Sequence, residues 1–241
     1  MPISLTQSKT AAITTLTSTH TLTFDTSVTV GSWVVIVWRA GTANRTPSVP
    51  SPGAGTWSGI QDFAAGAANS LGRVFCWSAQ HTVSGTQTFT ITLTGGTGVG
   101  TLAGYELSGV DVSGTPRGGS ATQSLASSTS WNLIASPGIT VNSGEFVVGG
   151  ASEANNGWGT LTPPSGFSTS ISSSSGTGQT SVWIGYRSTA GSNVTGAAST
   201  TVARAVVNGY QVYMPAPSGG PFPFYTSRKM VGGMASMRGA L

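Results

Sequence analysis

The chain has 241 residues, of which 38% are hydrophobic and only 7% are charged, with a formal net charge of +4. The apolar fraction allows a sizeable core and excludes a disordered chain, which combines low hydrophobicity with high net charge. Outside the last fourteen residues the charges nearly balance, so the body lacks the basic stripe of a nucleic-acid-binding protein. The single cysteine, Cys76, excludes an intramolecular disulfide.

The N-terminal residues lack both the basic region and the apolar run of a secretory signal. No apolar run approaches the roughly 18 residues that a membrane-spanning helix needs. We therefore expect a protein that is made in a cytoplasm, is not inserted into a membrane and has no nucleic-acid partner.

Strands are predicted along the whole chain, because Gly, Ser and Thr interrupt every window long enough for a helix. In the first half, a strand is expected to open at Thr6, and others at 21–24, 33–38, 74–77, 86–94 and 104–107. The segment 33–38 belongs to the longest apolar run and predicts a strand buried on both faces. Side chains alternate along a strand, so one face should carry Trp33, Val35 and Val37. The other face should carry Val34, Ile36 and Trp38.

The second half repeats motifs of the first half in the same order. Trp33-Val34-Val35 returns 113 positions later as Phe146-Val147-Val148, and Val74-Phe75-Cys76 returns 108 positions later as Val182-Trp183-Ile184. Thr6-Gln7-Ser8 and Gly104-Tyr105 return as Thr122-Gln123-Ser124 and Gly209-Tyr210, and Trp131-Asn132-Leu133 stands in place of the strand at 21–24. We infer a duplication with pseudo-repeats at about 1–110 and 118–214.

The expected fold is all-β: a jelly-roll-like antiparallel β-sandwich over residues 1–214, built from the two pseudo-repeats and followed by an extended C-terminal arm. Two tandem sandwiches of roughly 100 residues each are the alternative. One packed unit is favoured, because the segment 144–150 looks too short and too rich in glycine to centre a core of its own. The glycine-rich segment 108–120 would then serve as a loop or a linker.

Residues 215–241 fall outside the repeats. A Pro/Gly-rich arm is followed by a basic tail rich in Met, a side chain that suits adaptable interfaces. A frayed terminus is the alternative. We predict that this segment anchors the protein to a partner through Phe222, Phe224, Tyr225, Arg228, Lys229, Met230, Met234, Met237 and Arg238.

No group of residues predicts catalysis, a metal site or a cofactor. His20 and His81 lack a second histidine at ligand spacing, and we expect both at solvent-facing positions. Glycosidases use a pair of carboxylates, which keeps an enzyme among the alternatives. Turn hydrogen bonds and arginine partners are nevertheless the expected roles of Glu106, Asp111, Glu145 and Glu153.

Two tryptophans are candidates for ligand contact. Trp57 and Trp158 lie beside the long Pro/Gly loops, and loops at the end of a sandwich often bind ligands. They are predicted either to form a platform for a glycan or to plug the ends of the core.

The chain resembles a group of bacteriophage virion proteins, which are small β-sandwich modules of the minor tail or head-surface decoration type. The resemblance covers about residues 1–214 and rests on the motifs 31–35, Phe75-Cys76-Trp77, 104–110 and 146–149. It implies a non-enzymatic, structural or adhesive role in the virion, as a homo-oligomer in contact with other virion proteins and with a host-surface glycan. A carbohydrate-binding module and a polysaccharide-degrading enzyme are the alternative functions.

Overall fold

The computed structural model describes residues 1–40, 45–52, 59–66, 73–85, 88–135, 138–153, 160–173 and 181–218. The first half contains β1 (Ser4–Thr17), β2 (Thr19–Thr23), β3 (Trp33–Ala40), β4 (Thr46–Pro47), β5 (Ser51–Pro52), β6 (Ile60–Gly66), β7 (Arg73–Gln80), β8 (Thr88–Thr94) and β9 (Gly98–Ser108). The second half contains β10 (Arg117–Trp131), β11 (Ile139–Val141), β12 (Phe146–Glu153), β13 (Thr160–Thr162), β14 (Ser168–Ser173), β15 (Ser181–Arg187), β16 (Gly191–Val194) and β17 (Ala197–Tyr213). These residues form strands and no helix, so the all-β class is confirmed, and none of them belongs to a helix that could cross a membrane.

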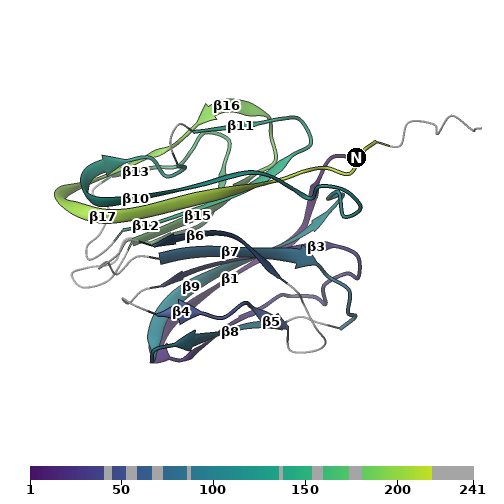
Figure 1. Cartoon of the computed structure of the whole chain (residues 1–241), viewed down its shortest axis with the longest axis horizontal. Helices are drawn as coiled ribbons and strands as arrows, with labels where there is room; N and C mark the ends of the chain where they lie inside the picture. The colour runs from purple at the N-terminus through teal and green to yellow at the C-terminus, as the bar shows by residue number, and fades with distance from the viewer. Residues whose placement is uncertain are drawn as a thin grey trace, which may run out of the picture.

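Four antiparallel sheets lie in layers, two from each half of the chain (Figure 1). In the first half, an outer sheet of β2, β8, β4 and β5 covers the larger sheet β1-β9-β3-β7-β6. In the second half, the larger sheet β10-β17-β12-β15-β14, with β13 on β17, is covered by the outer pair β11-β16. Every ladder between these strands stays within one half. The prediction that both halves form one jelly-roll sandwich over residues 1–214 is therefore wrong.

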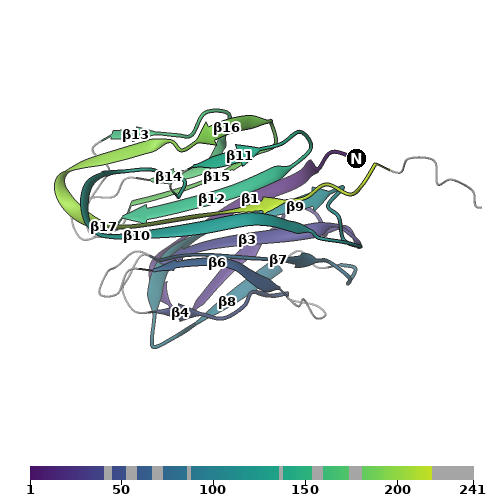
Figure 2. The ribbon, with the colours of Figure 1, turned by 45° about the horizontal axis from the view of Figure 1, so that its top comes forward.

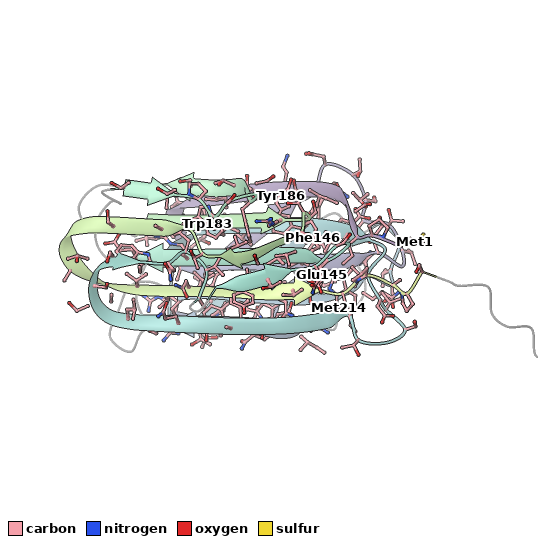
Figure 3. The ribbon with its side chains drawn as sticks, turned by 90° about the horizontal axis from the view of Figure 1, so that it is seen from above. Met1, Glu145, Phe146, Trp183, Tyr186 and Met214 are labelled. Atoms are coloured by element: carbon pink, nitrogen blue, oxygen red, sulfur yellow. The ribbon has the colours of Figure 1, made fainter. Side chains whose placement is uncertain are left out.

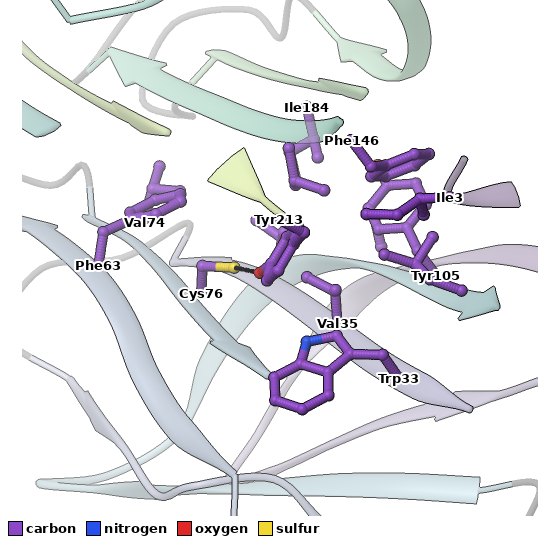
Figure 4. Close-up of a cluster of buried hydrophobic side chains, with 14 of the residues drawn as sticks. Ile3, Trp33, Val35, Phe63, Val74, Cys76, Tyr105, Phe146, Ile184 and Tyr213 are labelled. Carbon is purple, nitrogen blue, oxygen red and sulfur yellow. Dashed lines mark hydrogen bonds between the residues drawn. The ribbon is translucent and has the colours of Figure 1, made fainter. Parts of the chain in front are cut away.

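Three hydrophobic cores fill the spaces between the four layers. The middle core lies between the two larger sheets and includes Trp33, Val35 and Val37 from β3 (Figure 4). The core of the first half takes the other face of β3, with Val34, Ile36 and Trp38. Because both faces of β3 are buried, the alternation predicted for this strand is confirmed.

The strand β12 occupies the same central position in the second half. Phe146 and Val148 face the middle core, while Val147 and Ala151 face the core of the second half. The expectation that this glycine-rich segment could not centre a core is therefore wrong.

Glycines set the distance between the two larger sheets. A Cβ atom at Gly150 on β12 would lie 2.8 Å from Cγ1 of Val74 on β7. A Cβ atom at Gly209 on β17 would lie 2.7 Å from the ring of Phe63 on β6. The absence of side chains at these positions lets the sheets approach closely, which explains why glycine occurs in a buried strand.

The two larger sheets have the same strand order, as the predicted duplication requires. The strands β3 and β12 are each the middle strand of a larger sheet, and they begin at Trp33 and Phe146, as predicted. Val34 pairs with Ala79 on β7, and Val147 pairs with Arg187 on β15. The predicted offset of 108 positions between β7 and β15 is therefore confirmed.

The strands β9 and β17 are also equivalent, but their match is displaced by one residue from the prediction. Trp33 pairs with Leu107, and Phe146 pairs with Tyr213. A displacement of one residue moves a side chain to the opposite face. Tyr105 consequently faces the middle core, whereas Tyr210 packs against the core of the second half.

The edge strands depart further from the predicted match. Ala11 pairs with Leu102 in the first half, and Gln123 pairs with Asn208 in the second. Given the equivalence of β9 and β17, Gln123 is the counterpart of Ala11 and not of Gln7. The strand β10 also begins earlier than expected, inside the segment predicted to be a loop or linker.

Residues 131–133 do not form the separate strand that the repeat predicted. Trp131 ends β10, and the next strand of the second half is β11. The strand β11 pairs with β16 as β2 pairs with β8, so it takes the place of β2 in the outer layer.

The two halves pack in a reciprocal way. The edge strand β6 of the first half packs against β10 and β17 of the second. Its counterpart β14 contacts the first half, where the Tyr105 hydroxyl on β9 donates a hydrogen bond to Ser170 Oγ at 2.8 Å. The edge strand of each larger sheet therefore contacts the other half, as equivalent elements do across the interface of a two-fold symmetric dimer.

The chain start and the end of β17 meet at one end of the molecule (Figures 2 and 3). The α-amino group of Met1 donates a hydrogen bond to the Ala216 carbonyl at 2.8 Å, and Val110 bridges to Pro215. The ladder of β10 and β17 runs from this end towards the opposite end, where both strands curve. The first residues after β17 are therefore held against the body, whereas residues 219–241 lie outside the described residues.

Candidate functional site

The residues predicted to bind partners or glycans lie outside the described part of the chain. They are Trp57, Trp158 and the nine residues of the C-terminal anchor between Phe222 and Arg238. Their roles stay predictions. The described residues contain a different candidate site, a groove that the sequence did not indicate.

This groove has a volume of about 450 Å³ and is lined by residues of β10, of β13 and of the start of β17. The strands β10 and β17 curve at the end of the molecule away from Met1 (Figure 3). Its lining combines two amides, several hydroxyl groups and a few apolar groups, and no charged side chain occurs among its described residues. These residues are Gln123, Leu125, Ser130, Trp131, Asn132, Thr160, Thr162, Ala197, Ala198 and Ser199. A groove of this size and mixed lining is typical of a small-molecule site.

Strand pairing explains how the groove forms. The first residues of β17 are paired on both sides, because Ala198 lies opposite Trp131 of β10 and opposite Leu161 of β13. Alternation along β13 places Thr160 and Thr162 on one face, and both line the groove. Trp131 is 6% exposed and packs in the core of the second half. The wall of the groove that it forms is therefore fixed by core packing.

Asn208 on β17 contacts the backbone of Asn132 and the side-chain amide of Gln123. Its Nδ2 donates a hydrogen bond to the Asn132 carbonyl at 2.6 Å and a longer one to Gln123 Oε1 at 3.4 Å. Asn208 is 1% exposed, and its Oδ1 has no hydrogen-bond partner among the described residues. A buried amide that is only partly satisfied costs stability.

Both histidines are buried, so their expected solvent-facing positions are wrong. His20 accepts a hydrogen bond from Trp38 Nε1 at its Nδ1 and donates from Nε2 to the Gly98 carbonyl at 3.0 Å. Burial lowers the pKa of His20 and also that of His81 below the ordinary value. Both are neutral packing groups at pH 7, in positions away from the groove lining.

Glu106 is buried on β9 and is bound by protein donors. It accepts hydrogen bonds from Gln7 Nε2 at 2.5 Å and from the Thr29 amide at 2.8 Å. Burial raises the pKa of Glu106, but these hydrogen bonds outweigh it and hold the pKa below its ordinary value. The carboxylate therefore ties the edge of the first larger sheet to the loop before β3.

The other three carboxylates named above also have local partners. Asp111 accepts hydrogen bonds from the amides of Gly114 and Thr115, and Glu145 accepts them from Asn142. These are the expected turn roles.

Glu153 attracts Arg39, and Arg39 Nε also donates a hydrogen bond to Ser152 Oγ at 3.3 Å. Burial lowers the pKa of Arg39 to about 9, while Glu153 opposes that shift. The expected arginine partner is therefore present. None of the four carboxylates lines the groove.

A buried polar cluster joins the two halves beside the middle core. The Asp62 carboxylate on β6 pairs with Arg117 on β10, and the Tyr213 hydroxyl donates to its other oxygen at 2.7 Å. Arg117 also donates to the Ser78 carbonyl at 2.5 Å and lies over the Trp33 ring, 4.9 Å from its centroid. The cluster therefore locks the halves in place.

The same cluster includes the single cysteine. Cys76 Sγ lies 3.6 Å from the Tyr213 hydroxyl (Figure 4). Burial, together with the Asp62 charge, raises the pKa of the Cys76 thiol and of the Tyr213 phenol well above their ordinary values. Both groups stay protonated at pH 7, so the thiol is a packing group and not a nucleophile.

The chemistry available in the groove is hydrogen bonding and apolar contact. Its described lining offers no nucleophile with an adjacent base and no carboxylate pair. Across the described residues, no three His, Cys, Asp or Glu side chains gather where they could hold a metal ion. The groove is therefore suited to binding.

Comparisons with known protein families, with curated proteins and with solved structures found no match to this chain.

Proposed function

We propose that the chain is a non-enzymatic structural protein of a bacteriophage virion, displayed on the particle surface as a minor tail protein or a capsid decoration. In this proposal it is made in the host cytoplasm, assembles as a homo-oligomer with other virion proteins and contacts the host surface. The resemblance to phage virion modules motivates the proposal, and the layout of the molecule supports it.

The observation that carries the proposal is the position of the groove relative to the end of β17. Tyr213 lies opposite Arg117 at one end of the ladder between β10 and β17, and Ala198 lies opposite Trp131, beside the groove, at the other. A protein attached through the residues that follow Ala216 would present its groove away from the attachment point. This layout suits a module that is fixed to a particle and reaches outward.

The packing of the two halves also supports a structural role. The middle core and the Asp62–Arg117 pair join them without a disulfide. Burial of this kind gives a stiff body, which a particle component exposed to the environment requires. The proposal therefore treats residues 1–216 as the body and the following residues as its anchor.

Deleting residues 219–241 tests the anchor. We expect the truncated protein to melt within a few degrees of the full chain, because every described hydrogen bond of Met214 and Ala216 is kept. Incorporation into particles, measured by quantitative mass spectrometry of purified virions, should be lost. A full-length variant with Thr140→Glu, an exposed position on β11, is the matched control for handling and expression. Incorporation of the truncated protein at the full-length level would contradict the anchor.

A carbohydrate-binding module is the second candidate, and the uncharged groove favours it. The two candidates are compatible, since a virion surface protein that adheres to its host needs a ligand site. A polysaccharide-degrading enzyme has less support, because Glu106, Asp111 and Glu145 bind protein donors and none of the described carboxylates lines the groove.

A further inference from the structure

We infer that the groove between β10, β13 and β17 binds an uncharged saccharide, with the amides of Gln123 and Asn132 as the groups that recognise its hydroxyls. This inference deepens the adhesive part of the proposed function and names its ligand class. It rests on a comparison that the duplication itself provides, between the groove and the equivalent place in the first half.

In the first half the equivalent place is filled by apolar side chains. Trp38 on β3 pairs with Leu102 on β9, which pairs with Ala11 on β1. Trp38 and Leu102 are fully buried in the core of the first half, and Ala11 packs against it. This row across the sheet has no polar side chain, and it closes the core beneath His20.

In the second half the same row has been replaced by a small residue and two amides. Ala151 on β12 pairs with Asn208 on β17, which pairs with Gln123 on β10. Ala151 stands where Trp38 stands in the first half, and Asn208 stands where Leu102 stands. The frame is the same in both halves, so the exchange is local and concentrated beside the groove.

The exchange costs stability unless it has a use. The indole absent at Ala151 is supplied by Trp183, which pairs with Ala151 and is fully buried in the same core. The exchange of leucine for Asn208 is not offset in this way and sacrifices apolar burial. Burying Asn208 with its Oδ1 lacking a hydrogen-bond partner among the described residues adds a desolvation cost. In return, Asn208 Nδ2 holds the Asn132 backbone and the Gln123 side chain in place at the groove. That arrangement is typical of a binding site prepared before its ligand arrives.

The lining matches a saccharide in chemistry and size. Side-chain amides both donate and accept hydrogen bonds, as sugar hydroxyls do, and Ser130, Thr160 and Ser199 add hydroxyl groups. Trp131 and Leu125 provide the apolar contact that the C–H face of a sugar ring needs. The volume of about 450 Å³ lies within the range of small-ligand sites and fits one or two sugar rings.

The absence of charge from the described lining selects against acidic sugars. A carboxylate or sulfate group would lose its hydration in the groove without gaining a cation from these residues. The inference is therefore limited to neutral saccharides, which makes it open to a direct test.

The experiment uses the full-length protein on an array of neutral oligosaccharides of glucose, galactose, mannose and N-acetylglucosamine, printed with sialylated and sulfated counterparts. Saccharides that bind are then titrated calorimetrically. We expect neutral saccharides to bind and their charged counterparts not to bind. The variant Asn208→Leu, which copies Leu102 of the first half, should weaken binding about tenfold or more while melting at or above the temperature of the parent.

A second groove variant and a control variant test saccharide binding without changing Asn208. Thr160→Arg, at an exposed position of the groove, should also weaken binding about tenfold or more by filling it. Thr140→Glu, an exposed threonine outside the groove lining, should bind like the parent.

The inference is overturned if no neutral saccharide binds, if only charged saccharides bind, or if Asn208→Leu and Thr160→Arg both bind like the parent. A lowered melting temperature for Asn208→Leu with unchanged binding would also overturn it, because Asn208 would then be a purely structural residue. Particle incorporation separates this result from the proposed function. A protein that enters virions but binds no saccharide refutes only the inference, whereas one that binds saccharides but never enters virions refutes only the virion role.

Discussion

Two ion pairs of the described chain differ in how much water reaches them. The Asp62 side chain is fully buried beside Arg117, whereas Lys9 and Asp25 pair with side-chain exposures of 40% and 71%. Removing one partner of a buried pair leaves a lone buried charge, while exposed pairs contribute little. The two pairs therefore form a matched comparison of burial within one protein.

We expect Arg117→Met to lower the free energy of unfolding by about 3 kcal/mol. Lys9→Met should lower it by less than about 1 kcal/mol. Denaturant titration followed by circular dichroism measures both. Adding Asp62→Asn to Arg117→Met should recover part of the loss, because a neutral amide is less costly to bury than a lone carboxylate. Equal losses in the two single variants would show that water reaches Asp62.

The buried histidines make stability depend on pH. Burial lowers the pKa of His20 and His81, so the unfolded chain binds more protons than the folded protein as the pH falls below about 6.5. Stability should therefore be highest above that pH and decrease as the pH falls below it. Glu106, whose pKa is held low, adds a separate loss only below about pH 4.5.

The double variant His20→Gln and His81→Gln tests this assignment. Its melting temperature should be lower at pH 7.5, but it should vary less between pH 7.5 and 5 than that of the parent. Melting curves recorded by differential scanning calorimetry across this range measure the slope. A variant with the slope of the parent would assign the pH dependence to other groups.

At the scale of residues, the sequence predicts the burial of some polar side chains and not of others. His20 lies two positions from Leu22, so the alternation used for that strand already placed both on one face, which is the buried one. The Asp62 cluster gave no such signal, because Asp62 lies 55 positions from Arg117 and 151 from Tyr213. Asn208 was equally hidden, since only pairing across three strands sets it beneath Gln123 and Asn132.

At the scale of elements, strands with a continuous apolar run or a regular alternation were predictable, as β3 and β8 show, whereas β6 was not predicted. The segment 33–38 predicted β3, because a short continuous run of β-branched and aromatic residues is typical of a buried strand. The long strands β10 and β17 were found only in part, because their curved ends are rich in Ser, Thr and Ala, which carry no clear periodicity. The groove lies at these ends and was missed for the same reason.

The glycines of the larger sheets provide a prediction at this scale. Gly150→Ala should lower the free energy of unfolding by about 1–3 kcal/mol, because its Cβ would press on Val74 between two packed sheets. Gly119→Ala on β10, where nothing lies within 4 Å of an added Cβ, should be neutral or stabilise by about 0.5 kcal/mol. Chemical denaturation of both variants measures the difference. Equal effects would mean that the sheets are not in close contact at Gly150.

At the scale of the whole molecule, the order of motifs revealed the duplication but not how the halves meet. Whether the chain forms one sandwich or two depends on which layer covers each face of the larger sheets. The sequence does not show this, because a buried strand such as 33–38 is apolar on both faces. The glycines of the segment 144–150 predicted a weak core, whereas Gly150 lets the two larger sheets approach closely. A sequence does not show what lies opposite a glycine.

The middle core should hold the halves together even when the chain between them is cut. A protease site inserted in the exposed turn between Ser113 and Gly114 allows the folded protein to be nicked. We expect the two fragments to elute together and to keep the circular dichroism spectrum of the intact protein, because the core and the Asp62–Arg117 pair remain.

The same nick in a Val35→Asp background is the control for this experiment. It places an unpaired charge in the middle core, so the cut protein should separate into fragments or aggregate. Native mass spectrometry distinguishes these states. Separation of the nicked parent under native conditions would show that the covalent connection, and not the core, holds the halves.

The placement of β17 also determines how the body would carry a pulling force. From Val206 to Tyr213 the strand runs between β10 and β12, and its backbone hydrogen bonds to both neighbours stand across the strand direction. Tension applied to the residues after Tyr213 acts along this part of the strand, so it loads many of these bonds in shear at the same moment and does not open them one by one. A protein attached through the residues after Tyr213 should therefore resist unfolding when force is applied along this strand.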